Sequence, residues 1–165
     1  MEFLWSPWRL AYVTKAGRSS RPCVFCEAVE RPISESPLVV HKGQNVFVIM
    51  NLYPYNNGHL MVVPNRHIDS LAKASPVELQ ELMELTCQSE KALGEVYEPD
   101  GFNLGMNLGR PAGAGIADHL HMHVVPRWNG DTNFMTVVGT VRVLPETLEQ
   151  AVARLRPIFD CRRHS

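Results

Sequence analysis

The chain has 165 residues, which is enough for one compact domain with a core and too few for two ordinary domains. Hydrophobic residues make up 45% and charged residues 20%, which excludes a largely disordered chain. The formal net charge of -1 argues against a nucleic-acid binder that depends on a broad basic surface, although a local site can still hold a small anion.

The sequence offers no targeting or membrane segment. No apolar run approaches the ~20 residues that a membrane-spanning helix needs. Pro7 and Arg9 interrupt the aromatic N-terminal stretch, so it lacks the apolar core of a signal peptide. We therefore expect a cytoplasmic protein with no membrane partner.

In chain order, residues 1–20 are predicted to form an N-terminal arm, and residues 21–165 a single domain. Three strand-like runs follow at 37–40, 45–50 and 58–63. The segment LYPYNNG between the last two is rich in turn formers, which predicts an antiparallel hairpin with a wide loop.

A helix is predicted to begin after Ser75, because Pro76 suits the first helical position and Glu78 completes a capping box. An apolar stripe of helical period follows and predicts a face that packs on the core or on a partner. Its members are Leu79, Leu82, Met83, Thr86 and Leu93.

Two more strands, at 102–108 and 119–125, and one more helix complete the prediction. The helix begins near Pro145, has apolar residues at helical spacing, and is ended or kinked by Pro157. Several strands with two principal helices segregated from them indicate an α+β fold with a mainly antiparallel sheet.

The most informative segment is a row of alternating histidines, His119, His121 and His123. In a strand these side chains share one face, spaced roughly 6.6 Å apart, while the intervening apolar residues face the core. Besides a solvated strand face, two interpretations stand. One is a metal site built from all three imidazoles. The other is nucleophilic catalysis, in which one imidazole attacks and its neighbours orient it.

The segment before the histidines favours the second interpretation. Residues 107–115 are rich in glycine and alanine, so backbone N–H groups there can approach an anion closely, as in phosphate cradles. No carboxylate lies on the histidine face, since Asp118 points to the other side.

These residues resemble the histidine-triad (HIT) superfamily, whose signature alternates histidine with apolar residues and ends in two apolar residues. His119 to Val125 match it completely, and further matches spread the resemblance over about residues 20 to 135. They are Cys23, Cys26, Asn51, residues 58–67, Asn107 and residues 126–128. Residues 5–9 and 129–135 further resemble the branch that contains diadenosine tetraphosphate phosphorylases.

The resemblance implies a HIT-like fold and a mechanism. His121 attacks the α-phosphorus of an adenine nucleotide and carries it as a covalent adduct, which water or phosphate then releases. His123 and His59 serve as donors to phosphate, His119 supports them, and no catalytic metal is required. Residues implied to contact the nucleotide are Asn51, Asn107, Gly113, Ala114, Gly115 and Trp128.

One position departs from the family pattern. Many members carry serine or glutamine four residues before the first triad histidine, whereas this chain has Gly115. The missing side chain would no longer contact the leaving group, and the space it vacates would suit inorganic phosphate as the acceptor.

Cys23 and Cys26 have half of the spacing of a zinc site, and buried thiols in a turn are the plainer interpretation of such a pair. Some members of the superfamily hold zinc with two such cysteines and two histidines. By position the histidines are His67 and His119, which implies a closed structural zinc site.

The resemblance also implies a homodimer with a continuous sheet. Adenosine phosphoramidase activity and a non-catalytic nucleotide-binding regulatory module remain as alternative functions. His41 and His164 match no motif and are expected at the surface, while Trp5 and Trp8 suit packing across a dimer.

Overall fold

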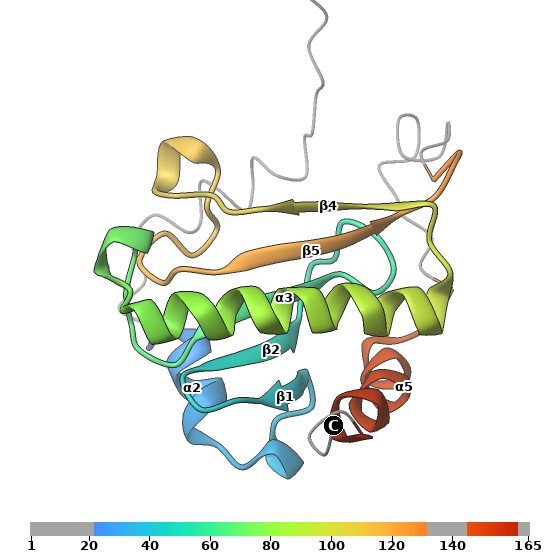
Figure 1. Ribbon diagram of the computed structural model, residues 1–165, viewed down its shortest axis with the longest axis horizontal. Helices are drawn as coiled ribbons and strands as arrows, with labels where there is room; N and C mark the ends of the chain where they lie inside the picture. Colours follow the sequence, from blue (N-terminus) through green and yellow to red (C-terminus); the bar gives the residue numbers. More distant parts are fainter. Residues whose placement is uncertain (1–21, 132–144, 162–165) are drawn as a thin grey trace, which may run out of the picture.

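The computed structural model describes residues 22–131 and 145–161, whose strands form one five-stranded antiparallel sheet (Figure 1). The strand order is β1-β2-β3-β5-β4, so β4 and β1 are the edges. The strands are β1 (Val39–Lys42), β2 (Val46–Met50), β3 (Leu60–Pro64), β4 (Gly101–Gly105) and β5 (Met122–Arg127). This architecture confirms the predicted α+β class with an antiparallel sheet.

The predicted hairpin is present, with β2 and β3 paired along their whole length from Val46↔Pro64 to Met50↔Leu60. The loop between them ends at Gly58, whose φ of 72° is unfavourable for residues with a side chain. A Cβ at this position would also lie 2.9 Å from the Tyr97 ring. Glycine is therefore required immediately before His59, where the chain enters β3.

Helix α3 (Pro76–Tyr97) crosses one face of the sheet (Figure 1). Ser75 and Glu78 form the predicted capping box. Leu82, Leu85 and Leu93 enter the larger core cluster with the apolar side chains of β2 and β3. Met83 is half exposed, so the predicted stripe is shifted around the helix at that point.

Helix α5 (Leu148–Cys161) packs beside α3 on the same face. It begins later than predicted because Thr147 and Gln150 form their own reciprocal cap. Pro157 does not end the helix, since Phe159 beyond it is buried in the core and anchors the last turn. His41 is also buried, stacked on Phe159 at 5.3 Å, so its predicted surface position is wrong.

The opposite face of the sheet carries α2 (Val24–Glu30), a short helix where the sequence predicted only a cysteine turn. Its Phe25 is buried against Phe47 and the second core cluster. This packing fixes the helix, and with it the two cysteines, against the sheet face that holds the histidines.

Three shorter differences complete the comparison with the predicted elements. Strand β4 ends at Gly105 rather than at residue 108, and β5 begins at Met122, three residues later than predicted. Short 3-10 turns lie at Ile33–Glu35, Leu71–Lys73 and Arg110–Ala112.

The predicted arm, Trp5, Trp8 and His164 lie outside the described residues. In the part of the chain that is described, no helix is both long and apolar enough to cross a bilayer.

An ion pair fixes the start of α3. Arg66 Nε and Nη2 each lie 2.7 Å from the carboxylate of Glu78, which is buried and also accepts from the Ser75 backbone at 2.7 Å. The hydrogen bonds from Arg66, and then those from Ser75, lower the pKa of Glu78 to about 2. The loop that carries His67 is thereby tied to the helix.

Glu78→Gln is expected to lower the free energy of unfolding at pH 7 by about 2 kcal/mol, because the Ser75 N–H and the Arg66 guanidinium lose a buried, charged acceptor. The folded-state pKa lies below the ordinary value of 4.5, so the carboxylate stabilises the fold above that pH. This contribution is lost as the pH falls from 4.5 towards 2. Thermal unfolding across this range should show the difference in Tm between wild type and Glu78→Gln becoming smaller as the pH falls. The control is Glu84→Gln, at an exposed position. A Tm difference that stays constant with pH would contradict the stabilising role of the Glu78 carboxylate.

Candidate functional site

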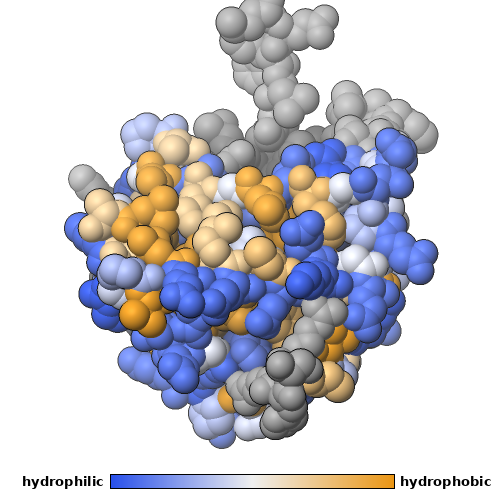
Figure 2. Space-filling view, in the orientation of Figure 1, coloured by the Kyte–Doolittle hydropathy of each residue, from blue (hydrophilic) through white to orange (hydrophobic). Residues whose placement is uncertain are grey.

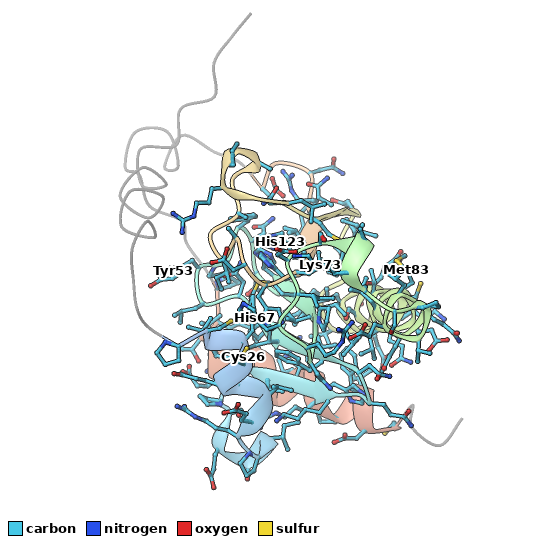
Figure 3. All side chains as sticks on the ribbon, turned by 90° about the vertical axis from the view of Figure 1, so that its left-hand side faces the viewer. Cys26, Tyr53, His67, Lys73, Met83 and His123 are labelled. Carbon is cyan, nitrogen blue, oxygen red and sulfur yellow. The ribbon has the colours of Figure 1, made fainter. Side chains whose placement is uncertain are left out.

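Four histidines gather on the α2 side of the sheet, and each is at least nine-tenths buried. Figure 3 labels one of them, His123, in the interior of the molecule. His123 lies on β5 opposite Met61, His59 directly precedes β3, and His119 and His121 lie just before β5. The His121 and His123 rings meet edge to face at 4.8 Å, and Phe25 packs against both His119 and His121 at 5.3 Å. The predicted common side of the three triad histidines is therefore present, although the ladder itself begins only at Met122.

A backbone carbonyl fixes the tautomer of His121, and burial keeps its ring neutral. Its Nδ1 lies 2.8 Å from the carbonyl oxygen of His119, which only accepts hydrogen bonds, so Nδ1 carries the hydrogen. The lone pair is consequently on Nε2. Burial lowers the pKa of His121 below its ordinary value of 6.5, which keeps the ring unprotonated at neutral pH. A neutral imidazole with a directed lone pair is what nucleophilic attack requires.

His59 and His123 form a second oriented pair. The backbone N–H of Tyr55 donates to His59 Nδ1 at 3.0 Å, so the hydrogen of His59 is on Nε2. That Nε2 lies 3.0 Å from His123 Nδ1 and donates to it, which places the hydrogen of His123 on its own Nε2. The Tyr55 ring packs on both imidazoles, with centroids at 4.7 and 5.7 Å. His123 can thus offer a hydrogen-bond donor beside the His121 ring.

Three more residues that were predicted to contact the nucleotide differ in how close they lie to the imidazoles. The Asn51 amide is 3.4 Å from His59 Nδ1, and its Oδ1 accepts from the Tyr53 N–H at 2.9 Å. Asn107 is half-buried just after β4. Trp128 follows the far end of β5, roughly 16 Å along the strand from His123. Asn51 is thus beside the imidazoles, and Trp128 is at the other end of the strand.

The glycine-rich loop turns back on itself before the histidines. Gly109 and Gly113 have φ values of 78° and 90°, in the region that favours glycine. The N–H groups of Gly113 and Ala114 bond to the carbonyls of Arg110 and Gly109, so the turn uses these two donors itself. Gly115 is half-buried and lies outside the left-handed region, so its backbone conformation is one that residues with a side chain also adopt.

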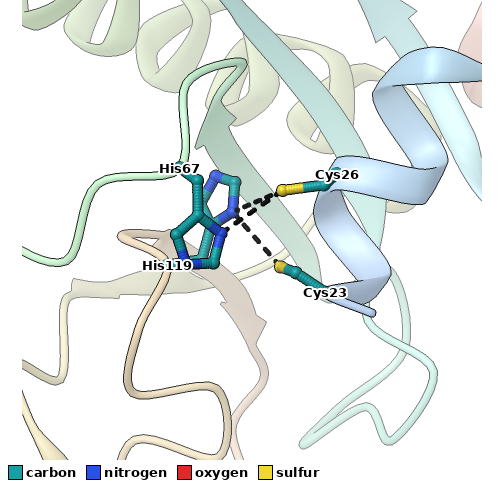
Figure 4. A group of neighbouring side chains, drawn as sticks. All are labelled: Cys23, Cys26, His67 and His119. Carbon is teal, nitrogen blue, oxygen red and sulfur yellow. Dashed lines mark hydrogen bonds between the residues drawn. The ribbon is translucent and has the colours of Figure 1, made fainter. Parts of the chain in front are cut away.

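Cys23, Cys26, His67 and His119 form a group able to hold a metal ion, with their ligand atoms all within 4.8 Å of one another (Figure 4). The sulfur to Nδ1 distances are 3.3 Å from Cys23 to His119, 3.3 Å from Cys26 to His67, and 3.7 Å from Cys26 to His119. Around tetrahedral zinc, with Zn–S of about 2.3 Å and Zn–N of about 2.05 Å, this separation is about 3.6 Å. Two thiolates and two imidazoles at this spacing fit zinc.

His119 links this cluster to His121. Its Nε2–H donates to the Pro64 carbonyl at 2.8 Å, so Nδ1 faces the two sulfurs with a lone pair. Its backbone carbonyl in turn accepts from His121 Nδ1. The three triad rings therefore point to different partners, and the metal-capable group found among residues 22–131 and 145–161 is the cysteine cluster. This geometry disfavours a metal held by all three.

Sequence reasoning did not identify Tyr55 or the Pro64 carbonyl, which set the hydrogens of His59 and His119. Both act through backbone atoms: every residue has the carbonyl, and every residue except proline has the N–H, so residue type carries almost no signal for them. The position of Tyr55 in the chain gives a weak signal, because it lies in the loop between Asn51 and His59, two residues that the sequence did single out.

Comparison with known proteins agrees with this site. The AP-4-A phosphorylase of Mycobacterium tuberculosis is 42% identical over 154 residues, which cover 90% of this chain and 79% of that protein. A crystal structure of a zinc-bound histidine-triad family protein from Mycobacterium smegmatis superposes with a TM-score of 0.69 at 28% identity, covering 88% of this chain and 99% of that one. A hypothetical histidine-triad nucleotide-binding protein from Sulfolobus tokodaii gives 0.68 at 26% identity, covering 84% and 93%.

The family model for the HIT domain matches residues 34–130, which include His59 and all three triad histidines. The same segment contains the whole antiparallel sheet and helix α3. By this match, and by the sequence and structural relatives that agree with it, the chain belongs to the HIT domain family.

Proposed function

We propose that this protein cleaves dinucleoside polyphosphates, such as diadenosine tetraphosphate, through a nucleotidyl-histidine intermediate on His121. The observation that carries the proposal is the fixed lone pair on His121 Nε2 beside the oriented His59–His123 pair. The name of the 42% identical relative, AP-4-A phosphorylase, supports this substrate class.

The reaction takes two displacements at one phosphorus. His121 Nε2 attacks the α-phosphorus, forms a P–N bond, and the bond to the bridging oxygen breaks as the second nucleotide leaves. His123 Nε2–H donates to a phosphate oxygen on which charge develops. An oxygen of the acceptor then attacks the same phosphorus, the P–N bond breaks, and the nucleotide leaves His121.

The nucleotide contacts in this proposal follow the loops around the imidazoles. Asn51 would bind the ribose, because its amide lies beside His59. Gly113, Ala114 and Gly115 would border the phosphates directly before the triad, with the N–H groups of Gly113 and Ala114 kept within the turn. Asn107 and Trp128 complete the proposed site for an adenine nucleotide.

Zinc in the Cys23, Cys26, His67 and His119 cluster would have a structural role. It would join α2, the loop after β3 and the segment before β5, three regions far apart in the sequence. The chemistry at His121 would then require no catalytic metal.

A homodimer in the cytoplasm completes the proposal, and its surface would be the β4 edge. Leu104 on β4 and Leu108 after it are close to half exposed, and Met83 of α3 is half exposed. Figure 2 shows hydrophobic side chains gathered over this side of the molecule, above the polar band of α3. Within the described residues β4 is an edge strand, and an edge strand with apolar neighbours favours pairing with the same strand of a second copy.

The identity of the acceptor decides between a phosphorylase and a hydrolase. With diadenosine tetraphosphate and phosphate we expect ADP and ATP, since phosphate would take AMP from His121 while ATP leaves. Without phosphate, turnover should fall at least about tenfold. Chromatography of the nucleotides with and without phosphate measures this. AMP and ATP formed at equal rates in both conditions would show a hydrolase instead, and turnover of adenosine phosphoramidates alone would contradict the substrate class.

A further inference from the structure

The loop between β2 and β3 is held at its tip by two carboxylates from distant parts of the chain. Asn56 Nδ2 donates to Asp131 Oδ2 at 2.8 Å and to the Pro126 carbonyl at 3.1 Å. The neighbouring Asn57 Nδ2 donates to Glu146 Oε1 at 3.1 Å. Two adjacent asparagines are therefore anchored separately, and only one of them adjoins Tyr55.

Asp131 is the anchor that holds Asn56, the residue next to Tyr55. Its side chain is only 10% exposed, and its Oδ2 lies 2.6 Å from Arg127 Nε and 3.2 Å from the Trp128 N–H. Its Oδ1 lies 2.9 Å from Arg127 Nη2. A carboxylate held by a two-point arginine contact is a rigid acceptor for the Asn56 amide.

Asn56 transmits this anchor to the imidazoles. Its own carbonyl accepts from the His59 N–H at 3.3 Å. The residue before it, Tyr55, supplies the N–H that bonds to His59 Nδ1 at 3.0 Å. Holding Asn56 therefore fixes both the backbone of His59 and the donor that decides which nitrogen of His59 carries the hydrogen.

We propose that Asp131 is a positioning residue for His123, acting through Asn56 and the Tyr55 N–H that keeps His59 in the Nε2–H tautomer. If the loop tip relaxes, His59 can place its hydrogen on Nδ1. Two lone pairs would then face each other across the 3.0 Å contact between His59 and His123. His123 would relieve this by moving its hydrogen to Nδ1, and its Nε2 would stop being a donor.

The test compares Asp131→Ala with Asp100→Ala. Asp100 accepts from the Asn129 N–H at 2.7 Å, so it anchors the same turn with the same type of side chain, and this hydrogen bond goes to the turn and not to the loop. Nitrogen-15 spectra of labelled imidazoles, assigned with His59→Gln, report the tautomer directly. In wild type and Asp100→Ala we expect His59 to be protonated on Nε2 alone. In Asp131→Ala we expect Nδ1–H to be populated, with kcat lowered about tenfold and KM little changed.

A second pair of variants tests whether the effect of Asp131 passes through Asn56. Asn56→Ala should reproduce the tautomer change, while Asn57→Ala, one residue away and anchored to Glu146, should not. Because both act on one path, Asn56→Ala combined with Asp131→Ala should add little to either alone. This pair also decides the matter if Asp131→Ala does not fold.

An unchanged His59 tautomer in Asn56→Ala would overturn the proposal, as would an equal change in Asp100→Ala or Asn57→Ala. The activity measurement rests on the proposed function, but the spectra do not. If the wild-type protein fails to cleave diadenosine tetraphosphate, the proposed function is wrong. The positioning role of Asp131 is then decided by the tautomer measurement alone.

Discussion

Replacement of His121 by alanine is expected to abolish cleavage of diadenosine tetraphosphate, lowering kcat/KM by at least about 10⁴-fold. The reason is the direction of its lone pair. The His119 carbonyl occupies Nδ1, so Nε2 is the atom left to attack, and burial keeps it unprotonated. No neighbouring imidazole can substitute, because His119 Nδ1 faces the cysteines and His123 Nδ1 accepts from His59.

The adduct gives a second measurement on the same variant. A wild-type reaction quenched in alkali, where P–N bonds survive, should contain the His121 peptide heavier by one nucleotidyl group. The His121→Ala protein should lack this species while still binding the nucleotide, which shows that the site is intact. Covalent nucleotide on another residue, or turnover within tenfold of wild type, would assign the nucleophile elsewhere. Binding without any turnover in the wild type would instead favour a regulatory module.

The parts of the fold that the sequence predicted well are those with local causes. The α3 start depends on Ser75, Pro76 and Glu78, which lie within four positions, and the hairpin depends on two alternating runs around one turn-rich loop. Short-range chemistry of this kind is visible without a structure.

The parts that were missed depend on residues far apart in sequence. Helix α2 is only seven residues long and is held by burial of Phe25 against the sheet. His41 is buried because Phe159 packs on it from α5. The segment before Met122 leaves the sheet ladder because Leu120 donates to the Ile68 carbonyl, beside the loop of His67.

In the candidate site, too, the features with local causes could be predicted and those with long-range causes could not. The periodicity predicts His119, His121 and His123 on one side of the chain, and the ring contacts agree, although only His123 lies in the strand. The tautomers require partners that the pattern does not contain, such as the N–H of Tyr55 and the carbonyl of Pro64. The anchor between Asn56 and Asp131 spans 75 positions, so only the folded chain reveals it.

Replacement of Cys23 by serine is expected to remove bound zinc and destabilise the fold together. Serine keeps the size of the side chain but is a poor zinc ligand, so one vertex of the Cys23, Cys26, His67 and His119 cluster is lost. If wild type is loaded at 100 to 1,000 times the dissociation constant, the lost stabilisation is about 3–4 kcal/mol. For a chain of this size that corresponds to about 10 °C in Tm. Metal analysis of the purified protein and thermal unfolding measure the two effects.

Cys87→Ser is the matched control, because Cys87 is an exposed thiol on α3 and lies outside the cluster. It should keep full zinc content and the wild-type Tm. A chelator should lower the Tm of wild type and Cys87→Ser to that of Cys23→Ser, and should leave Cys23→Ser itself unchanged. Unchanged zinc content in Cys23→Ser would end the assignment of the cluster. Metal retained after loss of both Cys23 and Cys26 would restore the interpretation that the triad imidazoles bind it. If the zinc is structural, Cys23→Ser should lower the free energy of unfolding by more than it raises the activation free energy calculated from kcat below the Tm. The reason is that His121 receives its orientation from the backbone carbonyl of His119 and not from the ion.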